Sequence, residues 1–184
     1  MRIVAGEARG RRLAPVPAGT RPVSDRAREG LFSSLGQDVA GARVLDVYAG
    51  TGALGVEALS RGADRATFVD SSYGATTTIK DNLDRTGFRA RARVIRKKAE
   101  RFLEQALDEP GERYDLILAD PPYDTPARAI DALVSGLIPL LSGPGSALVL
   151  TRPTKAYTPV VPVNLQVARR LRYGDSLILV YREV

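Results

Sequence analysis

The chain has 184 residues, a formal net charge of +6, and neither cysteine nor histidine. This length fits one domain, and the missing residue types exclude disulfides, thiolate nucleophiles, imidazole base catalysis and most catalytic zinc sites. Cytosine C5 methylation, which needs a cysteine, and zinc-dependent base deamination are excluded with them. No apolar run reaches the length of a membrane span, and the first residues lack a signal peptide's apolar stretch, so we expect a cytoplasmic protein.

The first 36 residues are predicted to form a basic extension followed by a helix. Residues 1–22 alternate weakly around Gly6 and end in a proline-rich loop, which predicts a small β-hairpin extension. Ser24 or Asp25 can cap a helix that ends at Gly36. This segment contains seven arginines but only three acids, and a second basic cluster spans 89–101. Such clusters favour a polyanion, although a solvated basic face explains the charge alone equally well.

From Arg43 onward, predicted strands and helices alternate. The strands are 44–47, 66–70, 93–96, 114–120 and 146–151, and the helices between them are 53–61, 77–85, 99–107 and 127–137. This alternation predicts an α/β fold with a Rossmann-like, doubly wound, mostly parallel sheet. Two further strands, 165–173 and 177–181, are joined at Gly174-Asp175 and predict an antiparallel hairpin at one edge. We expect residues 23–184 to form one domain.

The most specific motif is Asp120-Pro121-Pro122-Tyr123, which follows the apolar run 114–119. Proline cannot continue a central strand, so the chain must leave the sheet directly after Asp120. The Asp120 carboxylate and the Pro121 carbonyl are acceptors only, which suits an exocyclic NH2 group with two protons to donate. Holding both protons would direct the nitrogen lone pair toward a methyl donor, and Tyr123 offers a base a flat face. A strand end followed by a proline turn is the alternative explanation.

Three acids end predicted strands: Asp46 the first, Asp70 the second and Asp120 the fourth. The carboxyl ends of parallel strands meet at one sheet edge, where such sheets bind ligands. If the strand order reverses between the first and fourth strands, Asp46 and Asp120 flank the crevice and Asp70 lies one strand over. A lone acid at a strand end is most often a cap or turn former, but three on one edge favour a site.

Between the first strand and its helix, residues 50–55 match the dinucleotide-binding pattern G-x-G-x-x-G, with Asp70 near the expected distance. That pattern alone would predict NAD. Asp46 and the three residues after it widen the loop beyond what a pyrophosphate turn needs. The chain also lacks His, Cys and a Tyr-x-x-x-Lys pair for carbonyl chemistry. These features oppose an NAD site.

The spacing Asp46-x-x-x-Gly50-x-Gly52, followed by Asp70 and the proline motif, resembles class I S-adenosylmethionine (SAM)-dependent amino-methyltransferases. Further stretches narrow the resemblance to the bacterial small-subunit rRNA guanine-N2 methyltransferase family (RsmD type), and it covers nearly the whole chain. They are residues 2–6, 9–11, 21–29 and 31–32 near the amino terminus, and residues 48–62 around the glycine loop. The amino-terminal motifs are the family-specific part, because many amino-methyltransferases share the proline motif.

This resemblance implies SAM as the cofactor and a guanine of 16S rRNA, free or in the small ribosomal subunit, as the acceptor. We expect a monomer, and neither a metal nor a membrane partner. The catalytic residues would be Asp120, Pro121, Pro122 and Tyr123. The cofactor-binding residues would be Asp46, Tyr48, Gly50, Thr51, Gly52, Asp70, Ser71, Lys98 and Ala99. The RNA-binding residues would be Arg2, Arg9, Arg11, Arg12, Arg21 and Arg26, mostly in the extension 1–22, with the SAM-dependent methyltransferase domain at 23–184.

Within that site the resemblance implies a role for each part. The glycine loop would contact the methionine moiety, Asp70 would hold the ribose hydroxyls, and Asp46 would lie near the methionine ammonium, directly or through water. Two positions depart from the family pattern. Ser72 stands where a second acid or Asn is common, and Lys98 stands where Asp or Asn commonly precedes Ala. Lysine cannot accept a hydrogen bond from the adenine amino group, so backbone groups around Ala99 are expected to recognise adenine.

Other functions share part of this pattern. A DNA amino-methyltransferase has the proline motif, but it usually needs a target-recognition domain for which this chain has no room. A protein glutamine methyltransferase can carry a related motif without needing the amino-terminal arginines. A non-enzymatic ribosome-assembly factor would keep those arginines but have no use for Asp120.

Overall fold

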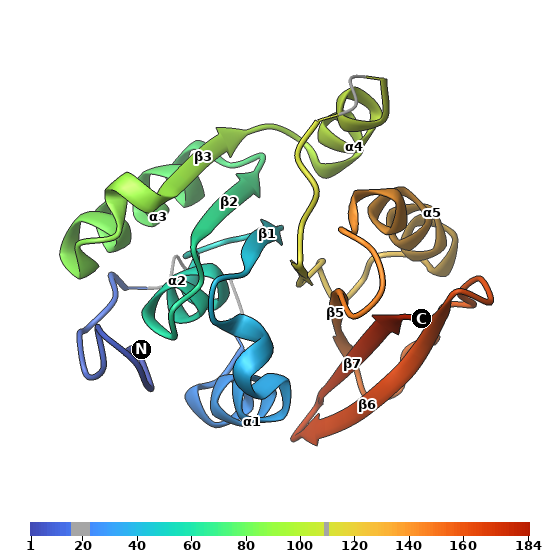
Figure 1. The fold of residues 1–184 in the computed structure, drawn as a ribbon, viewed down its shortest axis with the longest axis horizontal. Helices are drawn as coiled ribbons and strands as arrows, with labels where there is room; N and C mark the ends of the chain where they lie inside the picture. Colours follow the sequence, from blue (N-terminus) through green and yellow to red (C-terminus); the bar gives the residue numbers. More distant parts are fainter. Residues whose placement is uncertain (16–22, 109–110) are drawn as a thin grey trace.

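The computed structural model describes residues 1–15, 23–108 and 111–184, and these build a seven-stranded sheet between two layers of helices (Figure 1). The strand order is β3-β2-β1-β4-β5-β7-β6. The strands are β1 (Arg43–Val47), β2 (Arg65–Asp70), β3 (Ala92–Arg96), β4 (Leu116–Ala119), β5 (Ala147–Pro153), β6 (Leu165–Tyr173) and β7 (Ser176–Glu183). The helices are α1 (Asp25–Leu35), α2 (Ala53–Ser60), α3 (Tyr73–Thr86), α4 (Ala99–Asp108) and α5 (Ala127–Leu137), with short 3-10 turns at Gly36–Val39, Arg89–Arg91 and Ile138–Leu140.

The predicted doubly wound sheet is confirmed. Strands β1 to β5 pair in parallel, whereas β7 pairs antiparallel with β5 and β6. Strand β1 lies between β2 and β4, so the strand order reverses at β1, which is the condition under which Asp46 and Asp120 flank the crevice. Unlike the edge strand β3, the parallel strands β1, β2, β4 and β5 are almost fully buried, which explains why β4 is a continuous apolar run rather than an alternating one.

Two apolar clusters, one on each face of the sheet, form the core. Residues of β1 alternate between them, with Val44 in the cluster under α1, α2 and α3 and Leu45 in the cluster under α4 and α5. Phe32 of α1 belongs to the first cluster, and Ile130 of α5 to the second. Helices therefore cover both faces of the sheet, and a site can form at the edge where the parallel strands end.

Two predicted element starts were wrong by two residues or more. Strand β4 begins at Leu116 rather than 114, because Tyr114 forms only an isolated bridge with Leu141. Helix α3 begins at Tyr73 rather than 77, because the Ser72 hydroxyl accepts a hydrogen bond from the Ala75 N–H and caps the helix four residues earlier.

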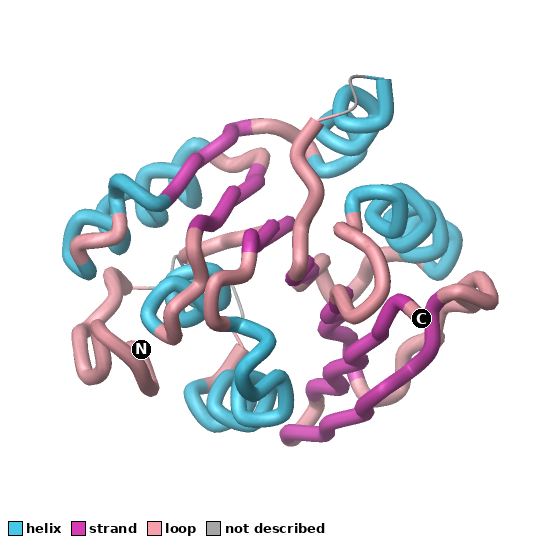
Figure 2. The backbone as a smooth tube through the Cα atoms, viewed as in Figure 1, coloured by secondary structure: helices cyan, strands magenta, loops and turns pink. Residues whose placement is uncertain are grey.

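The amino-terminal segment is a loop closed by one antiparallel bridge between Arg2 and Arg12, rather than a regular hairpin (Figure 2). Despite its many charged residues, the segment also packs against the core. Ile3, Ala8 and Leu13 are buried and belong to the cluster under α1 to α3. The described part of this segment therefore belongs to the same core as the sheet.

Candidate active site

The chain leaves the sheet at Asp120, directly after β4. The Asp120 N–H donates to the Val47 carbonyl at 3.4 Å, which keeps Asp120 beside the end of β1. Pro121 is buried and Pro122 is exposed. Among the described residues, neither the Asp120 carboxylate nor the Pro121 carbonyl accepts a hydrogen bond. Burial raises the pKa of Asp120 to about 7. Two unpartnered acceptors thus lie at the carboxyl end of the sheet.

The carboxylates of Asp46 and Asp70 hold the glycine loop by accepting hydrogen bonds from its backbone N–H groups. Asp46 is buried, and its Oδ2 accepts the Gly55 N–H at 2.9 Å, whereas its Oδ1 has no partner among the described residues. Burial raises the pKa of Asp46 well above its usual value, and the nearby Asp120 and Asp70 add to the rise. The Asp70 carboxylate accepts the N–H groups of Gly50 and Ser72, each at 2.9 Å.

The backbone of the glycine loop is tightly constrained. Tyr48 has a φ of 59°, an uncommon value for a residue with a side chain. Gly52 has a φ of 74° and precedes α2, and the Thr51 carbonyl accepts the Asn82 side-chain N–H at 2.8 Å. A Cβ added at Gly55 would lie 2.3 Å from the Phe68 ring, so helix α2 can approach β2 this closely only with glycine.

A pocket of about 350 Å³ opens beside this loop. Its lining includes five of the predicted cofactor residues, namely Tyr48, Asp70, Ser71, Lys98 and Ala99. The Tyr48 hydroxyl is 3.3 Å from Glu100 Oε1, and this contact joins the glycine loop to the start of α4. Ser71 and Lys98 are exposed, whereas Ala99 is buried. The remaining predicted cofactor residues, Asp46, Gly50, Thr51 and Gly52, lie in the adjoining loop and strand.

The proline loop is held from the other side by two residues that the sequence analysis missed. Arg152, buried near the end of β5, donates to the Pro122 carbonyl at 3.4 Å and to the Thr125 carbonyl at 3.1 Å. The Tyr123 and Ser176 hydroxyls are 2.5 Å apart. A charged residue at the carboxyl end of an apolar strand was a signal for Arg152, whereas no sequence pattern marks Ser176.

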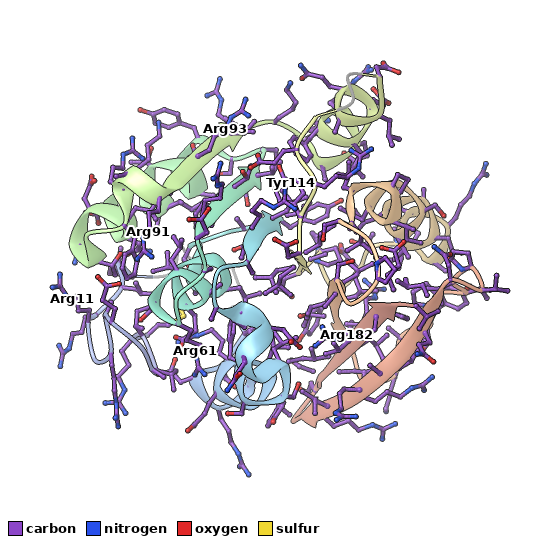
Figure 3. The ribbon with its side chains drawn as sticks, in the orientation of Figure 1. Arg11, Arg61, Arg91, Arg93, Tyr114 and Arg182 are labelled. Atoms are coloured by element: carbon purple, nitrogen blue, oxygen red, sulfur yellow. The ribbon has the colours of Figure 1, made fainter. Side chains whose placement is uncertain are left out.

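Most of the predicted RNA-binding arginines gather at the amino-terminal segment and α1. Arg2, Arg9 and Arg26 line one hollow of about 300 Å³. Arg11 donates to the Arg85 carbonyl at 2.7 Å and lies toward α3 (Figure 3). Arg12 is exposed, and Arg21 lies outside the described residues.

Buried polar side chains hold this segment against the body. Glu57 of α2 is fully buried and accepts the N–H groups of Val4 at 2.8 Å and Ala5 at 3.0 Å. Arg28 of α1 is also buried and donates to the Arg2 carbonyl at 2.5 Å.

Within residues 1–15, 23–108 and 111–184, no group of three or more acidic side chains is placed to hold a metal ion. No helix in the same ranges has the length and apolar character needed to cross a membrane.

Comparison with known proteins supports the same architecture. The family described as Conserved hypothetical protein 95 matches residues 1–182. YlbH of Bacillus subtilis (strain 168) is 34% identical over 186 residues, which cover 100% of this chain and 99% of the relative. Ribosomal RNA small subunit methyltransferase D of Escherichia coli (strain K12) is 41% identical over 125 residues, which cover 67% of this chain and only 60% of that relative. The solved structure of yhhF from Escherichia coli has a TM-score of 0.85 at 32% identity and covers 100% of this chain and 97% of that one.

Proposed function

The chain belongs to the family described as Conserved hypothetical protein 95, and from this membership we propose that it methylates the exocyclic N2 amine of a guanine in 16S rRNA, with SAM as the donor. The name of the Escherichia coli relative supports small-subunit rRNA as the acceptor. We further propose that the protein acts in the cytoplasm as a monomer, on rRNA that is free or part of the small subunit.

The observation that carries the proposal is the pair of unpartnered acceptors at Asp120 and Pro121 in the described part of the chain. A guanine N2 amine has two hydrogens to donate and a lone pair delocalised into the ring. The Asp120 carboxylate and the Pro121 carbonyl would each take one hydrogen, which leaves the lone pair directed away from them. The donor would supply its methyl group to this nitrogen and leave as a neutral thioether, and the Asp120 carboxylate would accept the proton that the methylated amine loses. Tyr123, fixed by Ser176, would stack on the flipped base.

The donor side of the edge fits SAM. When bound, SAM supplies an electrophilic methyl group on a sulfonium centre. Asp46 Oδ1 is a buried acceptor to which no described residue donates, which suits the methionine ammonium. Each Asp70 oxygen accepts one backbone N–H and keeps a lone pair for a ribose hydroxyl. Backbone groups at Lys98 and Ala99, in the pocket beside Asp70, would recognise adenine.

The arginines around the amino-terminal hollow would hold RNA. Arg2, Arg9 and Arg26 form no ion pair with an acid among the described residues, and phosphates would neutralise them. Residues 1–22 would then supply RNA contacts, and residues 23–184 would bind SAM and carry out the transfer.

Incubation with labelled SAM tests the proposal directly. The substrates are unmodified 16S rRNA and unmodified small subunits, and nucleoside mass spectrometry identifies the product. We expect the label in N2-methylguanosine. Label in DNA or in a protein glutamine would identify one of the alternative methyltransferases, and the absence of transfer to any acceptor would favour an assembly factor.

A further inference from the structure

The outermost strand, β6, carries a basic patch made of Arg169, Arg170 and Arg172. Its nine residues include three arginines and no acid, and the three arginines are exposed. Nitrogen-tipped side chains project outward along this strand in Figure 3. Leu171 and Tyr173 pack toward the core under α1. Since side chains alternate along a strand, Arg170 and Arg172 share the opposite face.

The charge of this patch is not neutralised by the described part of the protein. None of its three guanidinium groups forms an ion pair with an acid in those residues. The basic cluster at 89–101 is partly neutralised, although Arg93, Arg96, Lys97 and Lys98 form no ion pair with a described acid. There, Arg91 pairs with Glu7 at 3.1 Å and Arg101 with Glu104 at 2.8 Å. Because all three of its arginines are unpaired within the described residues, the β6 patch is a candidate for binding a polyanion.

Charged side chains on an edge strand also prevent sheets from joining, so charge alone does not show a partner. Position adds the second argument. Tyr173 ends β6 opposite Ser176, and the Ser176 hydroxyl contacts that of Tyr123 in the proline loop. At about 3.3 Å per residue, the arginines lie within about 13 Å of Tyr173 along the strand. The patch therefore begins near the acceptor site and extends away from it along β6.

Helix α1 packs against the same end of β6. A Cβ added at Gly30 would lie 1.6 Å from the Tyr173 hydroxyl, so α1 and the end of β6 are in close contact. Arg26, one turn earlier on α1, faces the amino-terminal hollow. Contacts therefore connect the acceptor site to two basic surfaces, the arginines of β6 and, through α1, the amino-terminal hollow.

We propose that the β6 patch binds the phosphodiester backbone of the substrate RNA beside the target nucleotide, on the side opposite to the amino-terminal arginines. This inference rests on the proposed function for the identity of the RNA. It assigns to β6 a contact surface for nucleotides that flank the methylated base.

The test compares RNA affinity at several salt concentrations for the wild type and for Arg170→Gln/Arg172→Gln, with unmodified 16S rRNA as the probe. We expect about tenfold weaker binding and a salt slope shallower by roughly 0.7–0.9 for each phosphate that the variant no longer neutralises. The matched control, Arg65→Gln/Arg113→Gln, removes two charges near the amino ends of β2 and β4, away from the acceptor site. It should bind RNA as the wild type does. Arg170→Lys/Arg172→Lys should restore the slope, because it restores the charge.

Methyl transfer by each protein separates the two proposals. Wild-type transfer to rRNA, with unchanged affinity and slope in the Gln variant, would overturn the role of β6 and leave the proposed function standing. RNA binding that depends on Arg170 and Arg172, without any methyl transfer, would support the surface and overturn the function. Unchanged binding to free rRNA, combined with lower activity on assembled subunits, would assign the patch to a ribosomal protein and contradict the proposal.

Discussion

Asp120 is an acceptor at the sheet edge whose protonation state controls what it can hold. Burial raises the pKa of Asp120 to about 7, so only above that pH is the carboxylate the main form. The protonated form carries an O–H donor in place of one acceptor lone pair, and this donor would compete with the amine for the Pro121 carbonyl. The reaction proposed for this site therefore needs the ionised form.

We expect kcat/KM for RNA to rise with pH through about 7 and then to level off, since it reports ionisations of the enzyme before RNA binds. The measurement is the rate at subsaturating RNA and saturating SAM between pH 5.5 and 9. Asp46 also has a raised pKa, so the affinity for SAM is measured over the same range to separate its titration. A rate that does not change across this range would contradict the assigned role of Asp120.

The same pKa predicts an effect on stability. A carboxyl whose pKa is raised by folding binds more protons in the folded state, so its ionisation destabilises the fold as the pH rises from about 4 to about 7. Asp120→Asn removes this cost. We expect the variant to be more stable than the wild type at pH 8 by about 2 kcal/mol or more, and equally stable near pH 4. Urea unfolding at both pH values measures the difference, and equal stability at pH 8 would count against the raised pKa.

Asp70 and Asp120 are predicted to separate donor binding from acceptor alignment. Asp70→Ala should weaken SAM binding roughly tenfold or more, because charge-assisted hydrogen bonds contribute about 1.5–3 kcal/mol each. Asp120→Ala should leave SAM affinity nearly unchanged and abolish turnover. Calorimetric titration of each variant with SAM measures the affinity. Asp81→Ala, which removes an exposed acid from α3, is the control and should bind SAM as the wild type does. Equal loss of SAM affinity in both variants would show that the two carboxylates are misassigned.

At the scale of single elements, Arg152 links β5 to the proline loop. Its two hydrogen bonds to the Pro122 and Thr125 carbonyls fix the backbone just after the Asp120 acceptor. Arg152→Met keeps an unbranched apolar side chain but removes both donors. We expect kcat/KM to fall about tenfold or more while SAM affinity is retained, because the acceptor geometry loosens and the donor site does not.

Arg182→Met is the matched control for Arg152→Met. Arg182 lies on the neighbouring strand β7 and donates to the Gly145 carbonyl at 2.7 Å, at the opposite end of β5. Its loss should leave activity unchanged. If Arg152→Met loses SAM affinity together with activity, the residue supports the whole sheet edge rather than the proline loop.

The elements themselves were largely predictable, because parallel strands buried on both faces give apolar runs that glycines and caps separate. Asp46, Asp70 and Asp120 could be placed on one edge for the same reason, since strand ends follow from the alternation of elements. Arg152 and Ser176 could not be placed in this way. The Arg152 contacts depend on β5 lying beside β4, and the Ser176 contact depends on the antiparallel pairing of β7 with β5. The sequence pattern gives neither the strand order nor the partners across it.

At the scale of the whole molecule, the amino-terminal segment joins RNA contacts to the core. Sequence pattern suggests an extension that could be removed, because six of its first twelve residues are glycine or arginine and few are large and apolar. The structure buries Ile3 and Leu13 and satisfies the buried Glu57 with the Val4 and Ala5 N–H groups. Burial of a few side chains is enough to tie the segment to the fold, and composition does not reveal it.

Deletion of residues 1–15 should therefore destabilise the protein rather than only weaken RNA binding. The loss of buried Ile3 and Leu13 costs about 1.5–3 kcal/mol for each side chain, and Glu57 loses two hydrogen bonds in the core. We expect the free energy of unfolding to fall by at least about 3 kcal/mol in urea titrations. Arg9→Gln/Arg12→Gln, in contrast, should keep the wild-type stability and lower RNA affinity with a shallower salt slope, because both side chains are exposed. A deletion variant as stable as the wild type would show that the segment is an independent extension after all.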